Sequence, residues 1–292
     1  MEGLIVKLLG GFYYVETSDG LYECRARGKF RKDEFSPVVG DRVTLTAQPD
    51  KTGTVDTVLP RKNKLRRPPL ANLDQLFLVI STRQPAPNLL MVDKLLAICE
   101  HQGIAPVLVF TKTDLASAEE LAAVYRPVGY PVLMGSPEED AFVEEARTLL
   151  AGKISAFAGN TGAGKSTFLN RVCPALHLQT GETSQKLGRG RHTTRHVELY
   201  PLPGGGYVAD TPGFGTMDVM QYGIIRKEEL QNCFPEFAPY VDHCRFTGCS
   251  HTKEKGCAVL EALERGEISA SRHENYCLLY EDAKQIKEWE LK

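Results

Sequence analysis

The fold of this chain is decided by Gly159-Asn160-Thr161-Gly162-Ala163-Gly164-Lys165-Ser166, which fits the pattern G-x-x-x-x-G-K-[ST] in full. This stretch follows an apolar run typical of a strand, ISAFA, and precedes one typical of a helix, TFLNRV. Glycines allow backbone N–H groups to wrap phosphates, and a helix N-terminus adds the positive end of its dipole. We therefore predict a phosphate-binding loop in which Lys165 reaches the β- and γ-phosphates, the Ser166 hydroxyl binds Mg²⁺, and Thr167 holds the inner phosphates.

A second motif, Val208-Ala209-Asp210-Thr211-Pro212-Gly213, ends another apolar strand. D-x-x-G by itself is a common turn, but downstream of a phosphate-binding loop it is typical of a γ-phosphate sensor. We expect Asp210 to lie near the Mg²⁺, usually through a water molecule, and the Gly213 N–H to lie near the γ-phosphate.

The third motif, Thr111-Lys112-Thr113-Asp114, follows the strand-like run PVLVF and matches [NT]-K-x-D, which recognises guanine. The Asp114 carboxylate can accept hydrogen bonds from both N1–H and N2–H₂ of guanine, and adenine cannot offer that pair. We expect the Lys112 stem to pack over the base, with Thr111 in place of the commoner Asn. After the next strand, Ser136 either offers a backbone N–H to the guanine O6 or belongs to a plain strand-end turn.

The order of these motifs is permuted, because the base motif at 111–114 precedes the phosphate loop at 159–166. The same sheet forms if the original ends are joined and new ends are cut elsewhere. Apolar runs such as LFLVIS and PVLVFT alternate with helical patterns, which predicts a mostly parallel sheet covered by helices on both faces. Since the chain beyond Asp210 continues into the C-terminal region, we expect loss of the γ-phosphate to move that region.

The first 60 residues contain short alternating segments separated by Gly, Asp and Pro, which predicts a small antiparallel barrel or sandwich. Residues 61–67, RKNKLRR, carry five basic side chains. The run is either a solvated linker, which we favour, or a contact for an anionic partner such as nucleic acid. From residue 223 onward the sequence holds a helical start (KEELQNCF), a Cys/His cluster and further helical sequence.

The cluster contains Cys244, Cys249, His251 and Cys257, spaced C-x₄-C-x-H-x₅-C. Three thiolates and one imidazole suit tetrahedral Zn²⁺, and four protein ligands make the site structural. His243 is a competing ligand, and the alternative of buried free thiols does not explain the polar filler SHTKEKG. The segment from Cys244 to Cys257 that carries these ligands is called the knuckle below. Its basic residues Arg245, Lys253 and Lys255 can contact RNA phosphates.

Composition and length exclude several classes of protein. The 292 residues are 42% hydrophobic and 25% charged with a net charge of −2, as in a globular protein of two or three domains. No apolar run reaches the roughly 18–20 residues that a membrane helix needs. The N-terminus lacks the pattern of a signal peptide, so we expect a cytoplasmic protein without a membrane partner.

Taken together, TKTD, GNTGAGKST, GRGRHTT, DTPG and the Cys/His cluster, in that order, make the whole chain resemble the circularly permuted, ribosome-small-subunit-dependent GTPases (the RsgA, YjeQ or YloQ family). The resemblance implies an OB-fold barrel that binds RNA (residues 1–66), a permuted P-loop GTPase domain (67–222) and a mostly helical zinc-binding domain (223–292). It implies a protein that binds GTP or GDP with Mg²⁺ and acts in late maturation of the small ribosomal subunit, through 16S-type rRNA and ribosomal proteins. We expect a monomer, although the sequence itself does not determine the oligomeric state.

The resemblance also assigns roles within GRGRHTT at 188–194, the switch I motif of the family. Thr194 would complete the Mg²⁺ coordination, with Thr193 as the other candidate. His192 would position or activate the attacking water. Phe214 follows D-x-x-G where Ras-like enzymes carry a glutamine, so another polar group must orient that water, and His192 is the nearest candidate. The alternative is a histidine that contacts RNA.

Two other functions stay open on the sequence. One is an RNA-binding assembly factor that uses GTP as a switch with little intrinsic catalysis. The other is a P-loop ATPase or metallochaperone with a zinc-finger tail, which Asp114 disfavours because its carboxylate suits guanine.

Overall fold

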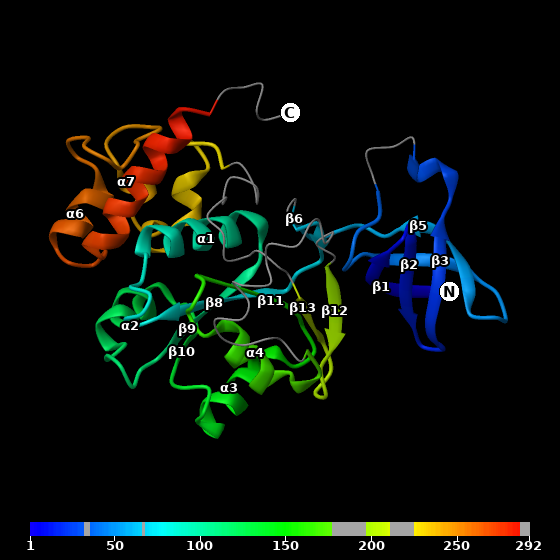
Figure 1. Cartoon of the computed structure of the whole chain (residues 1–292). Helices are drawn as coiled ribbons and strands as arrows, with labels where there is room; N and C mark the ends of the chain where they lie inside the picture. Colours follow the sequence, from blue (N-terminus) through cyan, green and yellow to red (C-terminus); the bar gives the residue numbers. More distant parts are fainter. Residues whose placement is uncertain (32–35, 66–67, 177–196, 211–224, 287–292) are drawn as a thin grey trace.

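The computed structural model describes residues 1–31, 36–65, 68–176, 197–210 and 225–286. Figure 1 shows three parts in chain order: a barrel (blue), a central sheet with its helices (cyan to green) and a helical C-terminal part (orange to red). The predicted domain boundaries after residues 66 and 222 fall outside the described residues and stay predictions. Within the described ranges, no helix is both long enough and apolar enough to cross a bilayer.

The strands are β1 (Glu2–Leu9), β2 (Phe12–Thr17), β3 (Gly20–Ala26), β4 (Arg42–Ala47), β5 (Thr52–Val58), β6 (Lys64–Leu65), β7 (Leu70–Ala71), β8 (Gln75–Ser81), β9 (Ala105–Thr111), β10 (Val132–Met134), β11 (Ile154–Gly159), β12 (Glu198–Pro201) and β13 (Tyr207–Asp210). The α-helices are α1 (Leu89–Gln102), α2 (Glu119–Tyr125), α3 (Asp140–Leu150), α4 (Lys165–Val172), α6 (Ala258–Glu264) and α7 (Ala270–Lys284). Short 3₁₀ turns are η1 (Gly28–Arg31), η2 (Arg126–Val128), η3 (Pro174–Leu176), η5 (Leu230–Cys233), η6 (Pro235–Phe237) and η7 (Val241–His243).

The N-terminal part is a closed barrel. Its strands follow the order β1-β2-β3-β5-β4, and β4 pairs back onto β1. Ile5, Val15, Val43 and Val55 are fully buried inside it. The prediction of a barrel is confirmed, with one difference: β3 and β5 pair in parallel, because β5 returns from its hairpin with β4 along the direction of β3.

The central sheet runs β10-β9-β8-β11-β13-β12, and all its neighbours are parallel except β12 and β13. Side chains alternate across it as the two-residue period requires. Leu76, Leu78 and Ile80 of β8 join the core formed with α1 and α2, while Phe77 and Val79 join the core formed with α3 and α4. The predicted parallel sheet, buried on both faces, is therefore confirmed.

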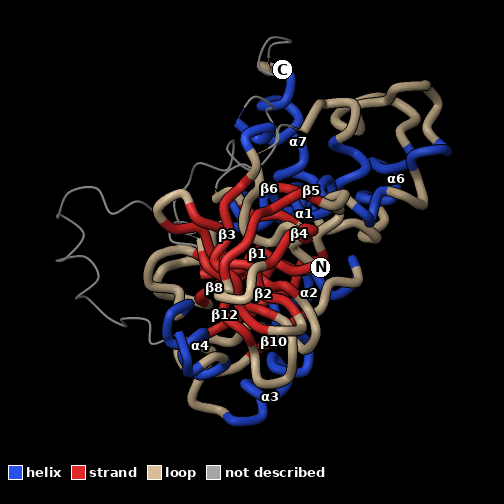
Figure 2. The backbone as a smooth tube through the Cα atoms, turned by 90° about the vertical axis from the view of Figure 1, so that its right-hand side faces the viewer, coloured by secondary structure: helices blue, strands red, loops and turns tan. Residues whose placement is uncertain are grey.

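The barrel and the central sheet form one continuous sheet. β1 pairs antiparallel with β12 at Lys7 and Glu198, and the Lys7 Nζ lies 3.0 Å from a carboxylate oxygen of Glu198. Seen from the barrel side, the strands of the barrel stand in front of those of the central sheet, with α3 and α4 below them and α7 above (Figure 2).

The C-terminal part packs around Phe234, Phe237 and Tyr276, all nearly fully buried. The predicted helical start at 227–234 is wrong as an α-helix, because the structure has only the 3₁₀ turn η5 there. Pro235 prevents a helix from continuing past Phe234, since proline disfavours helical backbone in the preceding residue and lacks an N–H of its own.

The basic run at 61–67 is not a solvated linker in its described part. The Arg61 side chain is only 8% exposed and donates from Nε and Nη2 to the two carboxylate oxygens of Asp41, at 2.6 Å each. Lys62 pairs with Asp74, and Asn63 is buried against the backbone of Leu73. These acidic and backbone partners lie about ten to twenty residues away in sequence, so the run alone could not reveal them.

Candidate functional site

The base motif at 111–114, the phosphate loop at 159–166 and Asp210 meet at one edge of the central sheet. β8, β9, β11 and β13 run in parallel, so their carboxyl ends share that edge. The chain builds the sheet outward from β8 to β10 and then returns to place β11 on the other side of β8. In open α/β sheets, ligands bind in the crevice outside such a switch point.

The predicted phosphate loop connects β11 to α4 through left-handed glycines. Gly162 has φ of +83° and Gly164 has φ of +86°, a region that side chains with a Cβ rarely adopt. The Ala163 N–H donates to the Asn160 carbonyl at 3.0 Å, which curls the loop back on itself. α4 begins at Lys165, so Lys165 and Ser166 lie in its first turn, and Thr167 is exposed.

A hydrogen bond joins the base motif to the phosphate loop. The Thr111 hydroxyl, at the end of β9, donates to the Ala163 carbonyl at 2.6 Å, and both residues are 1% exposed. Thr111 thus does more than replace the commoner Asn, because it fixes the distance between the two predicted sites. Fifty-two residues separate the pair in sequence, and sequence reasoning missed the contact.

The rest of the base motif lies on the loop beyond β9. Lys112 has φ of +58°, its carbonyl accepts from the Thr82 hydroxyl at 2.7 Å, and its Nζ donates to the Gln84 carbonyl. Asp114 is exposed in the following turn. The structure therefore holds Lys112 from the segment after β8 and leaves the Asp114 side chain open to solvent.

Ser136, after β10, is engaged within its own turn. Its backbone N–H donates to a Glu139 carboxylate oxygen at 3.0 Å, and its hydroxyl donates to Glu138. That hydrogen bond lowers the pKa of Glu138. A contact between this N–H and guanine would therefore replace the bond to Glu139.

Several predicted site residues lie partly or wholly outside the described residues. Asp210 is the last residue of β13, beside β11, and its side chain is not described. His192, Thr193, Thr194 and Gly213 lie in segments outside the described residues. Their assigned roles stay predictions.

The predicted metal ligands converge. The ligand atoms of Cys244, Cys249, His251 and Cys257 all lie within 4.8 Å of one another. The Cys244 and Cys257 sulfurs are 3.8 Å apart, and the His251 Nδ1 lies 3.6 Å and 3.4 Å from them. Metal–sulfur bonds of about 2.3 Å and a metal–nitrogen bond of about 2.0 Å give tetrahedral edges of about 3.8 Å and 3.5 Å. The four residues therefore fit a Zn²⁺ ion.

The surroundings of the cluster orient its ligands. The His251 Nε2 lies 2.7 Å from Gln231 Oε1, so Nδ1 is left to face the cysteines. Burial raises the pKa of the Cys249 thiol to about 12, so a cation beside it is needed to hold the thiolate at neutral pH. His243, the competing ligand, is exposed and outside the cluster.

Glu254 closes the loop between the ligands. Its carboxylate accepts from the backbone N–H groups of Ser250, Thr252 and Lys253 at 3.0–3.1 Å. Partial burial raises the pKa of Glu254, but hydrogen bonds from the Ser250 hydroxyl and from the N–H groups of Lys253 and Ser250 outweigh it and lower the pKa to about 2. No sequence pattern indicates this role of Glu254 or the contact of Gln231 with His251.

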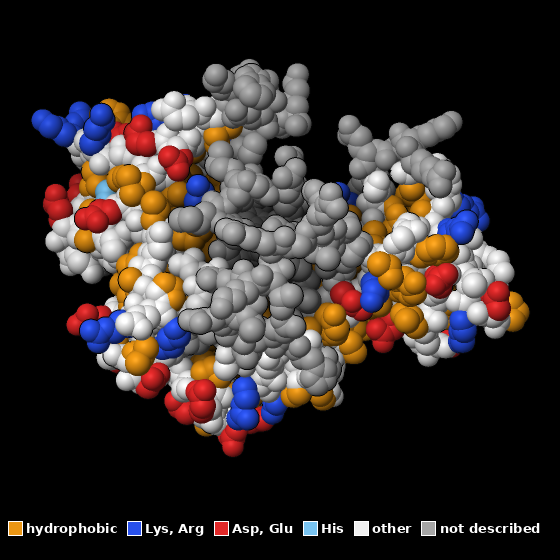
Figure 3. Space-filling view, in the orientation of Figure 1, with side chains coloured by type: hydrophobic (Ala, Val, Ile, Leu, Met, Phe, Trp, Pro, Cys, Tyr) orange, Lys and Arg blue, Asp and Glu red, His pale blue; other side chains and the backbone are white. Residues whose placement is uncertain are grey.

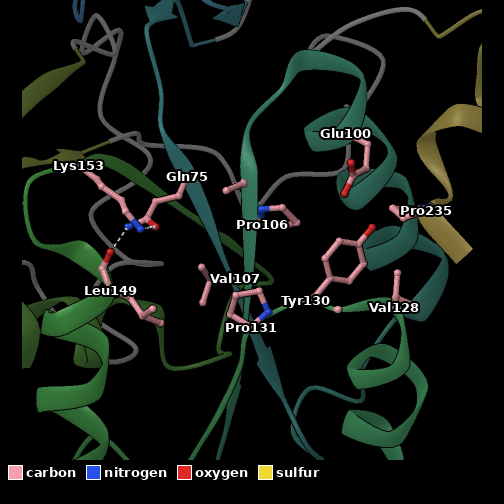
Figure 4. Close-up of a pocket in the computed structure, with 12 residues that line it drawn as sticks. Gln75, Glu100, Pro106, Val107, Val128, Tyr130, Pro131, Leu149, Lys153 and Pro235 are labelled. Atoms are coloured by element: carbon pink, nitrogen blue, oxygen red, sulfur yellow. Dashed lines mark hydrogen bonds between the residues drawn. The ribbon is translucent and has the colours of Figure 1, made fainter.

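A pocket of about 310 Å³ lies at the opposite edge of the sheet from the nucleotide motifs. Figure 4 shows Lys153 beside Gln75 on one side of it and the Tyr130 hydroxyl directed toward Glu100 and Pro235 on the other. Burial raises the pKa of Glu100, and the neighbouring Tyr130 hydroxyl and Arg272 partly oppose that shift.

The fold and the site together define a P-loop GTPase with permuted motifs, set between a barrel and a helical part that carries a Cys₃His cluster. The model of the RsgA GTPase family matches residues 58–220, and that of the RsgA N-terminal domain matches residues 2–55. The chain belongs to the RsgA GTPase family.

Relatives and solved structures of the family span nearly the whole chain. A protein of Shouchella clausii named small ribosomal subunit biogenesis GTPase RsgA is 45% identical over 94% of both chains. One of the same name from Caldanaerobacter subterraneus is 44% identical over 98% of this chain and 96% of its own. YjeQ from Thermotoga maritima superimposes with a TM-score of 0.85 at 35% identity, covering 98% of this chain and 99% of its own. YloQ, described as a circularly permuted GTPase, gives 0.81 at 36%, with 98% and 96% covered.

Proposed function

We propose that this chain hydrolyses GTP to GDP and phosphate and acts in the biogenesis of the small ribosomal subunit, which stimulates the hydrolysis. The observation that carries the proposal is the hydrogen bond from Thr111 to Ala163, because it ties a guanine motif to a phosphate loop at the switch point of the sheet. The names of the relatives support the ribosomal half.

In this proposal each motif has one task. Asp114 recognises the guanine edge, and the Lys112 stem packs over the base. The backbone N–H groups of residues 159–164 surround the phosphates, and Lys165 balances their charge, while Thr167 and Gly213 contact their oxygens.

Mg²⁺ bound with GTP would neutralise charge that develops on the phosphates. The Ser166 hydroxyl, Asp210 and Thr194 form an all-oxygen donor set, which suits this ion. We assign His192 to orienting the attacking water, since Phe214 stands where Ras-like enzymes place a glutamine.

The Cys₃His cluster would hold a structural Zn²⁺ ion. The ion would cross-link the knuckle and would take no part in GTP hydrolysis. Support comes from the ligand distances of 3.4–3.8 Å and from the Gln231 contact to His251. Arg245, Lys253 and Lys255 on the same knuckle are the residues we propose to contact RNA phosphates.

We propose that the protein works as a cytoplasmic monomer on the small subunit. Its charge does not mark it as a general RNA-binding protein: acidic and basic side chains are interspersed over the visible barrel and central part (Figure 3), in line with a net charge of −2. We therefore attribute binding to a shaped surface on the barrel and knuckle.

The decisive experiment measures GTP turnover by the purified chain with and without small ribosomal subunits. We expect slow turnover alone and a rise of at least tenfold with subunits. Large subunits at equal concentration are the control, because their rRNA carries the same charge per nucleotide. No rise with small subunits would remove the ribosomal half, and nucleotide-dependent subunit binding without turnover would favour the alternative of a GTP-switched assembly factor.

A further inference from the structure

Helix α1 belongs to two hydrophobic cores at once. Leu95, Leu96 and Ile98 pack in the core shared with β8 and β9, whereas Ala97 packs in the C-terminal core with Phe234. Figure 1 shows α1 lying between the central sheet and the C-terminal helices. A displacement of the C-terminal part therefore acts directly on α1.

A buried ion network fixes this contact. Arg272 of α7 is 0% exposed, and its Nη1 donates to Asp93 Oδ1 of α1 at 2.7 Å. Its Nε and Nη2 donate to the two oxygens of Glu236 at 2.7 and 3.0 Å, and Asn275 Nδ2 donates to the other Asp93 oxygen at 2.6 Å. Because water is excluded, the polar groups of each side chain find their hydrogen-bond partners in one arrangement only. The network therefore determines where α1 lies.

The N-terminal end of α1 stands at the predicted nucleotide site. Asn88 caps the helix by accepting from the Met91 N–H at 3.1 Å, and it directly follows the segment 82–87. That segment lies beside the phosphate loop and contacts the base motif. A Cβ placed on Gly162 of the phosphate loop would lie 3.5 Å from Pro85, and the Gln84 carbonyl accepts from the Lys112 Nζ.

Asp93 lies close to that end. It is the fifth residue of α1, and at a rise of 1.5 Å per residue it stands about 7.5 Å along the axis from Asn88. A shift of the helix at Asp93 therefore reaches segment 82–88 across little more than one turn.

We propose that Asp93 and Arg272 are positioning residues of the nucleotide site: they hold α1, and through it segment 82–88, against the phosphate loop and the base motif. Docking of the C-terminal domain then raises the affinity for guanine nucleotide. By thermodynamic linkage, bound nucleotide raises the equilibrium constant for docking by the same factor. This inference rests on the proposed function, and it adds a path to the C-terminal domain that does not use the segment beyond Asp210.

The test compares Asp93→Asn with Lys94→Ala in the full-length, zinc-loaded chain. Lys94 is a matched control, because it is the next residue of α1 and also faces α7, with its Nζ 3.8 Å from Asp282, but in a more exposed pair. The measurement is the equilibrium Kd for a fluorescent GDP analogue, alongside turnover at saturating GTP. We expect Asp93→Asn to raise the Kd at least fivefold with turnover within twofold of wild type, and Lys94→Ala to leave both within twofold.

A folded, zinc-loaded Asp93→Asn protein with a Kd within twofold of wild type overturns the inference. Should that variant not fold, amide exchange in the wild-type chain decides. GDP must slow exchange in α7, and equal rates with and without GDP overturn the inference. Failure of the proposed function has a different signature, since the wild-type chain then shows no GDP binding or no turnover.

Discussion

Replacing Thr111 with valine tests how far the link between the two motifs organises the site. Valine has nearly the shape of threonine, so packing is preserved, but the Ala163 carbonyl loses a buried donor at 2.6 Å. Leaving such a group without its partner costs about 1–3 kcal/mol. Taking about 2 kcal/mol, and roughly 2–4 °C per kcal/mol for a unit of this size, we expect the Tm of the GTPase domain to fall by about 4–8 °C.

The same change should weaken nucleotide binding, because the phosphate loop would no longer be held at its distance from the base motif. If the loss of that restraint reduces the free energy of GDP binding by about 1–2 kcal/mol, the Kd for GDP rises roughly fivefold to thirtyfold. Calorimetric titration with GDP and a thermal melt of the same preparation measure both effects. Thr111→Ser keeps the hydroxyl and should recover most of the affinity. A Thr111→Val protein with wild-type Tm and Kd would refute the reasoning.

Three further predictions follow from the backbone and the metal knuckle. Gly159→Ala should destabilise the chain by more than about 2 kcal/mol in urea titrations, since a Cβ there lies 2.4 Å from a carbonyl oxygen of β8, while Gly28→Ala, with open space, should be nearly neutral. Cys257→Ser should abolish zinc binding and make the C-terminal domain sensitive to protease, whereas Cys277→Ser, outside the cluster, should retain about one metal per chain. Glu254→Gln should cost about 1 kcal/mol at neutral pH. Because the folded pKa of Glu254 is about 2, below its ordinary value of 4.5, this deficit should shrink as the pH falls below about 4.5, and a constant deficit would contradict its cause.

Local patterns were enough to predict much of the fold. The continuous apolar run of β8 predicted a strand buried on both faces, and the strand–loop–helix setting of residues 159–166 predicted the phosphate loop. The spacing of Cys244, Cys249, His251 and Cys257 predicted a cluster, because ligands so close in sequence need only one tight knuckle to meet. In each case the physical cause acts within about fifteen residues.

Contacts between distant segments escaped prediction. Arg272 reads as one basic residue on a helical stretch, and its partner Asp93 is 179 residues away. Arg61 was interpreted as part of a solvated run, because Asp41 belongs to a different strand region whose position only the closed barrel defines. The Thr111 hydroxyl gave no sign of its carbonyl acceptor, since any backbone oxygen can serve.

The pairing of β1 with β12 has a consequence for the solubility of fragments. An unpaired edge strand offers its N–H and C=O groups to other chains and promotes aggregation. Here the edge strand of the central sheet is β12, and β1 of the barrel pairs with it at Lys7 and Glu198. The other neighbour of β12 is β13, which ends at Asp210. Removing the barrel would therefore do more than delete one domain, because it would leave β12 as an unpaired edge strand that can pair with other copies of the fragment.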